Sequence, residues 1–369
     1  MNRFVRQENL AGFGTIGQQA LREASVLVVG AGGLGCPALS YLCAAGVGTI
    51  GIIDGDVIEW SNLNRQILFG VQQVGQSKAL SAVQLLQEKY PDITLRGYFE
   101  WLTNVSALSL IASFDLVVDG SDNFPTRYLV NDACTLLKKP LVTGAIHQHE
   151  GQLMVFAPPE PGLQYINYRD VFPQAPGAFE IPNCEQTGVI GALPGAIGTL
   201  LAMEAIKWLS GYGVPLLNKL LLYDGRNSSM TQFAIVHHPE SEKFLPATLS
   251  EFLAKDYGGK CLTELKVEWK TALSIMAYDP HCSVLVDIRE SHEMPDSTGL
   301  DCLKLPVDSL LQSCESLAPY DHVFLFCQSG QRSLVVADKL QQGVCGKKIY
   351  SIIGGALHED APFDQKNQP

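Results

Sequence analysis

A glycine-rich loop near the N-terminus constrains the fold of this 369-residue chain more than any other feature. The loop GAGGLG, at residues 30–35, follows the apolar run VLVV and precedes a segment with helical spacing, and Asp54 ends the next apolar run. Glycines let a phosphate approach the backbone at a helix N-terminus, and an acid on the next strand can hold ribose hydroxyls. This order predicts a nucleotide-binding, doubly wound α/β sheet, and the loop alone favours NAD or FAD.

Alternating strand and helix patterns extend this prediction from Ser25 to about Leu209. Between Phe156 and Asn183, six prolines interrupt any sustained period, which predicts a long loop that crosses over a site. Glycine spacing in the apolar stretch Gln186–Met203 favours a buried helix packed closely against protein. We expect sheet strands at VLVVG, TIGIIDGD, LVVDGSD, LVTGAI and QLMVFAP.

The residues after the second strand change the expected nucleotide. Asn62, Arg65 and Gln66 lie in the run SNLNRQ, and Lys78 follows in GQSK. A dehydrogenase does not need an asparagine, an arginine and a lysine just beyond its ribose-binding acid. A triphosphate that is attacked at its α-phosphorus, in contrast, needs cations around its oxygens. ATP therefore becomes the expected ligand.

A second acidic motif, GSDN, places Asp122 and Asn123 after another buried strand at the same edge of the sheet. A carboxylate there could hold Mg²⁺, which prefers oxygen ligands. Ser121 or Asp122 could also cap the helix that follows. The two roles are compatible.

A second loop, CQSGQRS at Cys327–Ser333, follows the apolar run VFLF and leads into a helical pattern. A cysteine at a strand end, surrounded by backbone N–H groups with Arg332 nearby, is favoured as a thiolate, and its loop can hold an anion. The four residues between Cys327 and Arg332 match the tighter loop of rhodanese sulfurtransferases rather than the longer loop of phosphatases. The pattern therefore predicts a reactive cysteine.

Taken together, the motifs of residues 3–238 resemble the ubiquitin-activating-enzyme superfamily, and within it the bacterial MoeB/ThiF adenylyltransferases. The matching runs come in the family's order: GAGGLG, DGDVIEWSNLNRQ, VGQSK, DGSDN and NCEQTGV. Residues 263–362, with VDIRE before the cysteine loop and IGGA after it, resemble a single rhodanese domain.

The resemblance implies a Rossmann-like adenylyltransferase domain followed by a small α/β rhodanese domain. The expected boundaries are an ATP-binding domain at 1–240, a linker at 241–262, the rhodanese domain at 263–362 and a tail at 363–369.

The resemblance also implies roles for single residues. Arg6 resembles an arginine finger that reaches into the nucleotide site of a partner subunit, which implies a homodimer. Asp122, with Asn123, would position Mg²⁺. Cys327 would carry the persulfide, Arg332 would stabilise it, and Cys184 could act as a second, resolving thiol. The expected nucleotide-binding residues are Gly30, Gly32, Gly33, Gly35, Asp54, Asp56, Asn62, Arg65, Gln66 and Lys78.

The implied reaction is adenylation of the C-terminal glycine of a ubiquitin-like sulfur carrier of the MoaD/ThiS type, with ATP and Mg²⁺. The Cys327 persulfide then converts the acyl-adenylate into a thiocarboxylate, for molybdopterin or thiamine biosynthesis. The sulfur donor is left open between a cysteine desulfurase and thiosulfate.

The chain departs from the family pattern at a structural zinc site. Many relatives bind zinc through two C-x-x-C pairs, but the corresponding stretches here, 167–170 and 239–244, contain no cysteine. We therefore expect no zinc, and we expect the crossing loop to be held by packing alone.

Charge and composition exclude other classes of protein. The formal net charge is −12, and no block of Lys and Arg could neutralise a nucleic acid or an anionic membrane. The N-terminus has no apolar signal segment and no two cysteines form a C-x-x-C pair, so a cytoplasmic chain with reduced thiols is expected.

Two alternatives remain at this point. One is an NAD(P)-linked oxidoreductase fused to a phosphatase-like module, which Arg65, Lys78 and the length of the cysteine loop disfavour. The other is an adaptor that binds the carrier without catalysis. The joint presence of both candidate sites disfavours it.

Overall fold

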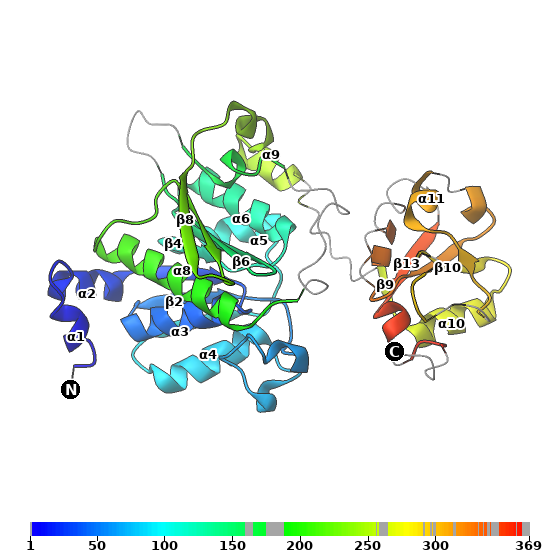
Figure 1. The fold of residues 1–369 in the computed structure, drawn as a ribbon, viewed down its shortest axis with the longest axis horizontal. Coiled ribbons are helices and arrows are strands. Elements are labelled where there is room, and N and C mark those ends of the chain that lie inside the picture. Colours follow the sequence, from blue (N-terminus) through cyan, green and yellow to red (C-terminus); the bar gives the residue numbers. More distant parts are fainter. Residues whose placement is uncertain are drawn as a thin grey trace. The chain divides into compact units, whose positions relative to one another are not determined.

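The chain forms two compact units, Met1–Gly259 and Lys260–Pro369, in a computed structural model (Figure 1). The described residues are 2–158, 165–174, 188–255, 257, 265–290, 292–295, 297, 300–312, 315–330, 332–334, 336–337, 340, 347–358 and 360–363.

The first unit is built on an eight-stranded sheet with the order β3-β2-β1-β4-β5-β6-β7-β8. Neighbouring strands from β3 to β5 are parallel, and those from β5 to β8 are antiparallel. The predicted strands are confirmed as β1, β2, β4, β5 and β6, whereas β3, β7 and β8 were not predicted. The bounds are β1 Ser25–Val29, β2 Thr49–Ile53, β3 Thr94–Tyr98, β4 Leu116–Asp119, β5 Leu141–His147, β6 Glu150–Phe156, β7 Lys219–Asp224 and β8 Ser229–Ala234.

Helices cover both faces of this sheet. Along β1, Val26 and Val28 pack in one apolar cluster with α3 and α8, while Leu27 and Val29 pack in another with α5 and α6. Burial on both faces explains why β1, β2 and β4 are continuous apolar runs, unlike the partly exposed edge strand β3. The bounds are α1 Val5–Glu8, α2 Gly14–Glu23, α3 Gly35–Ala45, α4 Lys78–Lys89, α5 Asn104–Ala112, α6 Phe124–Leu137, α8 Ala192–Ser210 and α9 Leu249–Ala254, with 3₁₀ turns η1 Trp60–Asn62, η2 Val71–Gln73, η3 Tyr168–Asp170 and η4 Pro239–Phe244.

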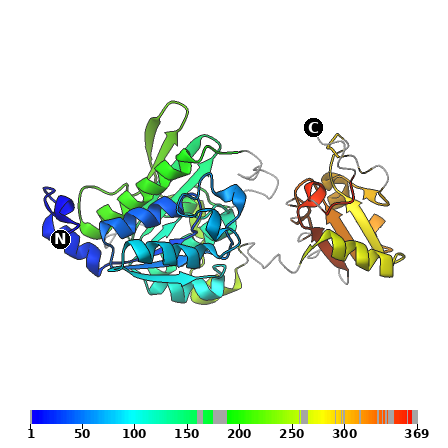
Figure 2. The ribbon, with the colours of Figure 1, turned by 90° about the horizontal axis from the view of Figure 1, so that it is seen from below.

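Helix α8 confirms the buried helix that the glycine spacing predicted. By length and composition it could cross a membrane, but Leu193, Ile197 and Leu201 belong to the core of the first unit. A Cβ atom on Gly198 would lie 2.2 Å from the carbonyl oxygen of Leu34. Glycine at this position therefore allows α8 to lie directly against α3 (Figure 2).

The two stretches that lack the family's cysteine pairs form η3 and η4, and the expectation that packing alone holds the crossing loop is wrong. Asp170 Oδ1 accepts hydrogen bonds from the His238 N–H at 2.8 Å and from the Ser241 hydroxyl at 2.7 Å. Arg169 donates two hydrogen bonds, at 2.6 and 2.8 Å, to the fully buried carboxylate of Asp132 on α6. Buried polar groups with satisfied partners therefore tie this segment to the domain.

The end of the first unit joins the same network. Lys255 Nζ and the Tyr257 hydroxyl donate to Asp132 Oδ2 at 3.1 and 2.9 Å, and Phe252 of α9 is completely buried. Part of the expected linker 241–262 thus packs on the first unit, because α9 buries an aromatic side chain there.

The second unit is built on a parallel five-stranded sheet with the order β11-β10-β12-β13-β9. On β12, Val323 and Leu325 face one apolar cluster, and Phe324 and Phe326 face the other together with Trp269. The apolar run VFLF before the cysteine loop forms β12, and β10 and β13 lie on either side of it in the sheet. The bounds are β9 Lys266–Val267, β10 Ser283–Asp287, β11 Leu303–Lys304, β12 His322–Phe326, β13 Lys348–Ile352, α10 Trp269–Tyr278, α11 Val307–Gln312, η6 Glu315–Leu317 and η7 Gly355–Leu357.

Candidate functional site

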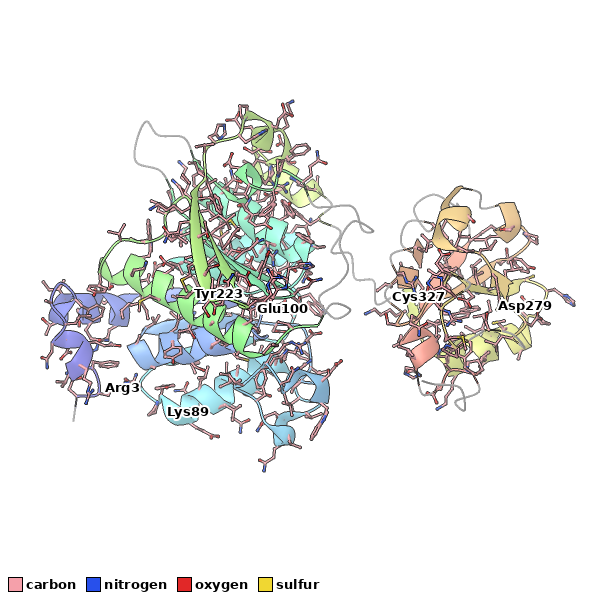
Figure 3. All side chains as sticks on the ribbon, in the orientation of Figure 1. Arg3, Lys89, Glu100, Tyr223, Asp279 and Cys327 are labelled. Carbon is pink, nitrogen blue, oxygen red and sulfur yellow. The ribbon has the colours of Figure 1, made fainter. Side chains whose placement is uncertain are left out.

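A cavity of about 840 Å³ lies at the carboxyl ends of β1, β2, β4 and β5 in the first unit. This is the edge of a doubly wound sheet where ligands bind. Glu100 forms part of its wall, and Figure 3 shows that residue within the first unit. Most of the predicted nucleotide-binding residues meet here, namely Gly30, Gly32, Gly33, Asp54, Asp56, Arg65, Gln66, Lys78, Asp122 and Asn123.

The glycine loop between β1 and α3 has the geometry of a phosphate-binding turn. Gly30 has a φ of +88°, and a Cβ atom on Gly35 would lie 1.9 Å from the carbonyl oxygen of Gly30. The Ala31 N–H donates to Asp54 Oδ2 at 2.8 Å, and no side chain caps the N-terminus of α3. No side chain therefore occupies the first N–H groups of α3, and they can donate hydrogen bonds to a bound anion.

We expect Gly35→Ala to destabilise the chain by at least about 2 kcal/mol, because its Cβ atom would overlap the backbone. Gly195→Ala is the matched control. It lies inside α8 with no atom within 4 Å of the added carbon, so it should stabilise the chain by about 0.5–1 kcal/mol. Urea unfolding of the full chain measures both changes. Equal urea midpoints for the two variants would contradict the close approach of Gly35 to the Gly30 carbonyl oxygen.

Asp54, Asp56 and Lys78 form a charged cluster at the ends of β2 and α4. Lys78 Nζ donates to Asp56 Oδ2 at 2.8 Å, and only 9% of its side chain is exposed. Burial alone would lower the pKa of Lys78, but the carboxylates of Asp54 and Asp56 outweigh it and raise the pKa. Burial raises the pKa of Asp54, while Lys78 acts in the opposite direction. Lys78 is thus a fixed cation on the cavity wall.

The segment from η1 onward contributes a second cation. Arg65 lines the cavity and donates to the Ser61 carbonyl and to Asn64 Oδ1, both at 3.0 Å. The predicted phosphate ligand Asn62 is placed differently: its Oδ1 accepts from the Glu59 N–H at 3.1 Å, and it does not line the described cavity. Asn62 therefore shapes the turn that presents Arg65, and Asn64 is the asparagine on the wall.

Asp122 and Asn123 follow β4 as predicted, but the helix cap is Asn123 and not Ser121 or Asp122. Asn123 Oδ1 accepts from the Thr126 N–H at 2.9 Å at the start of α6. This leaves Asp122 exposed on the cavity edge. No group of three or more His, Cys, Asp or Glu residues in the described ranges could hold a metal ion. A single carboxylate suits Mg²⁺ that is shared with substrate phosphates.

The wall also contains buried polar groups, and one of them belongs to Arg127, which the sequence analysis did not name as a site residue. Arg127 is buried, and its Nη2 donates to the Ser121 carbonyl at 2.9 Å. Arg127 Nε, Gln66 Oε1 and Ser121 Oγ are buried without a hydrogen-bond partner. Such groups are costly unless a ligand or water satisfies them. The cavity therefore fits a ligand with several polar groups.

Arg6, like Asn62 and Gly35, is not among the described residues that line the cavity. It is exposed on α1, at one edge of the first unit (Figure 1). Cys184 lies outside the described residues.

In the second unit, Cys327 directly follows the central strand β12 (Figure 3). It is fully buried, and its Sγ accepts from the Ser333 N–H at 3.4 Å and the Ser333 hydroxyl at 3.6 Å. The IGGA run packs onto this loop: the Ala356 N–H donates to the Cys327 carbonyl, and a Cβ atom on Gly355 would lie 2.1 Å from that oxygen. Both donors to the sulfur in these contacts thus come from Ser333, one from its backbone and one from its side chain.

Arg332 is held by an acidic partner that the sequence analysis did not identify. Its Nη1 donates to Glu293 Oε1 at 2.8 Å, and its Nη2 contacts Glu293 Oε2. The hydrogen bond with Glu293, with a smaller contribution from Cys327, raises the pKa of Arg332.

Comparison with known proteins agrees with the geometry of the first unit. The model of the ThiF family matches residues 4–243. The chain belongs to the ThiF family. The "Sulfur carrier protein adenylyltransferase" of Thermus thermophilus is a relative with 48% identity over 240 residues, which cover 65% of this chain and 89% of the relative.

Two ThiF relatives match nearly the whole chain. The "Probable adenylyltransferase/sulfurtransferase MoeZ" of Mycobacterium tuberculosis is 38% identical over 343 residues, covering 90% of this chain and 86% of the relative. The "Adenylyltransferase and sulfurtransferase MOCS3" of Drosophila virilis is 34% identical over 375 residues, covering 96% of this chain and 82% of the relative. Both relatives therefore match across both units of this chain.

Solved structures confirm the ThiF fold of the first unit. Escherichia coli MccB with ATP superposes with a TM-score of 0.54 and 22% identity, over 64% of this chain and 72% of MccB. PaaA superposes with a TM-score of 0.54 and 18% identity, over 63% of this chain and 72% of PaaA. Identities this low establish the architecture alone.

Proposed function

We propose that this chain adenylates the C-terminal glycine of a ubiquitin-like sulfur carrier of the MoaD/ThiS type and then transfers sulfur to it from Cys327. The observation that carries the proposal is the convergence of the glycine loop, Asp54, Arg65 and Lys78 on one cavity, in a chain that also bears a donor-lined cysteine loop. The names of the relatives support the same pair of activities.

In the first step, a carboxylate oxygen of the carrier attacks the α-phosphorus of ATP, and the bond to pyrophosphate breaks to give an acyl-adenylate. Asp54 would hold the ribose, and Arg65 and Lys78, with Gln66 and Asp56 beside them, would position the phosphates and stabilise their charge. Asp122 would hold Mg²⁺, which neutralises phosphate charge when bound. No protein nucleophile is needed.

In the second step, the outer sulfur of the Cys327 persulfide attacks the acyl carbon, and AMP leaves. The carrier is then joined to Cys327 through an acyl disulfide. A thiolate at Cys184 would attack Cys327 Sγ and break that bond, which releases the carrier thiocarboxylate and leaves a Cys184–Cys327 disulfide.

The remaining parts of the proposal follow the family resemblance. Arg6, exposed on α1, would complete the nucleotide site of a second copy, so the working form would be a homodimer. Residues 263–362 would act as a rhodanese domain that receives sulfur from a cysteine desulfurase or from thiosulfate. The reaction would take place in the cytoplasm, without nucleic acid or membrane, in molybdopterin or thiamine biosynthesis.

The test is to incubate the purified chain with ATP, Mg²⁺, cysteine persulfide as the sulfur source and each candidate carrier, and to read the carrier's intact mass. We expect one carrier to gain the mass that corresponds to replacing its C-terminal hydroxyl with a thiol. A control without ATP should show no change. Unmodified carriers in every reaction, despite measurable ATP binding, would favour the adaptor alternative.

A further inference from the structure

Glu293 forms an ion pair with Arg332, the cation of the cysteine loop. Its carboxylate binds Arg332 through both oxygens, at 2.8 Å for Arg332 Nη1 to Glu293 Oε1. Only 17% of the Glu293 side chain is exposed. Burial alone would raise the pKa of Glu293, but Arg332 and the Glu290 N–H outweigh it and lower the pKa. The carboxylate is therefore ionised at neutral pH.

The segment that carries Glu293 is fixed from several sides. The Glu290 N–H donates to Glu293 Oε1 at 2.9 Å. Gln328, next to the cysteine, donates from Nε2 to the Met294 carbonyl at 2.6 Å, and Arg289 Nη1 donates to the Pro295 carbonyl at 2.9 Å. The carboxylate is thus held by the turn and by the cysteine loop itself, so its position does not depend on Arg332 alone.

The second arginine near the loop is also paired with a carboxylate. Arg289 donates to both oxygens of Asp287, at 2.9 and 2.8 Å, and also contacts Gln328 Oε1 at 3.2 Å. The positive charge of each arginine is therefore balanced by an acid from the chain. A doubly charged anion that enters this loop would meet two arginines whose charges these carboxylates already balance.

The two sulfur donors that remain open, thiosulfate and a thiol persulfide, differ in the charge of the group that leaves. In both cases the Cys327 thiolate attacks the outer sulfur, a new S–S bond forms, and the donor's S–S bond breaks. With thiosulfate the electron pair leaves on sulfite, a dianion. With a persulfide it leaves on the donor thiol, and no sulfonate group has to be accommodated. Like charges at a binding site disfavour a ligand strongly.

We propose that Glu293 is a specificity-determining residue that excludes thiosulfate and makes a thiol persulfide, such as that of a cysteine desulfurase, the sulfur donor. The inference rests on the proposed sulfurtransferase function of Cys327. It goes further because it chooses between donors that the reaction itself leaves open.

The experiment measures sulfur loading of Cys327 in the full-length protein, by intact mass, with thiosulfate and with cysteine persulfide as probes. Glu293→Gln keeps the shape of the side chain and removes its charge. We expect it to raise the rate with thiosulfate, relative to cysteine persulfide, by roughly tenfold or more. Glu290→Gln is the matched control, because Glu290 is an exposed acid on the same turn, and it should leave the ratio unchanged.

Glu293→Ala removes the same charge with a different side chain and should shift the ratio in the same direction. An unchanged donor ratio in both Glu293 variants, or an equal fall with both donors, overturns the inference and assigns Glu293 a structural role. Cys327→Ala must abolish loading. If the unaltered protein loads neither donor, the proposed sulfurtransferase function fails, and this inference fails with it.

Discussion

Replacing Cys327 with alanine should abolish thiocarboxylate formation from cysteine persulfide, while carrier-dependent exchange between ATP and pyrophosphate continues at its normal rate. The physical reason is that adenylation uses cations and positioning in the first unit, whereas the sulfur is held on the β12 loop of the second. Exchange of labelled pyrophosphate into ATP measures the first step. The intact mass of the carrier measures the second.

Two controls sharpen this prediction. Cys282→Ala removes another free cysteine of the same unit and should leave both activities intact. Inorganic sulfide should restore thiocarboxylate formation in Cys327→Ala, because it can attack the acyl-adenylate directly. Loss of both exchange and thiocarboxylate in Cys327→Ala, with a normal unfolding transition, would refute the division of labour between the two units.

Replacing Lys78 with glutamine should lower ATP–pyrophosphate exchange by about a hundredfold to a thousandfold. The variant removes a buried cation from a cavity wall and leaves the carboxylates of Asp54 and Asp56 without it. Those charges would then repel the phosphates that Lys78 is proposed to hold. Loading of Cys327 from cysteine persulfide should be unchanged, so this variant is the reciprocal of Cys327→Ala.

Lys89→Gln is the matched control, because Lys89 is an exposed lysine at the other end of α4 (Figure 3). Its exchange rate should stay within about twofold of the original chain, as for most surface substitutions. Thermal unfolding of both variants checks that the first unit is folded. An exchange rate for Lys78→Gln close to that of Lys89→Gln would remove Lys78 from the proposed mechanism.

Local patterns predicted the strands β1, β2, β4 and β5 and the glycine loop, because each depends on residues that are close in the chain. The apolar runs of β1, β2 and β4 are long because both faces are covered. Strand β8 was missed for the opposite reason: all of its residues are exposed, so it has no apolar face to give a period. Its pairing with β7 is visible only in the structure.

In the site, too, residues that follow from a short sequence pattern were predicted, whereas contacts between residues far apart in the chain were not. Asp54 was predicted because it directly follows a strand, and Arg332 because its spacing from Cys327 is short. The pairing of Arg332 with Glu293, 39 residues away, has no local pattern. Burial of Arg127 is similarly invisible in the sequence, because arginine is normally an exposed residue.

The buried Asp132–Arg169 pair and the hydrogen bonds of Asp170 bear on how the protein matures in a cell. All of these partners are side chains or backbone groups of the chain itself. These contacts of residues 169 and 170 therefore form in the folding reaction itself. None of these contacts involves a thiol, so an oxidant that modifies cysteines leaves them intact, whatever it does to the redox state of Cys327.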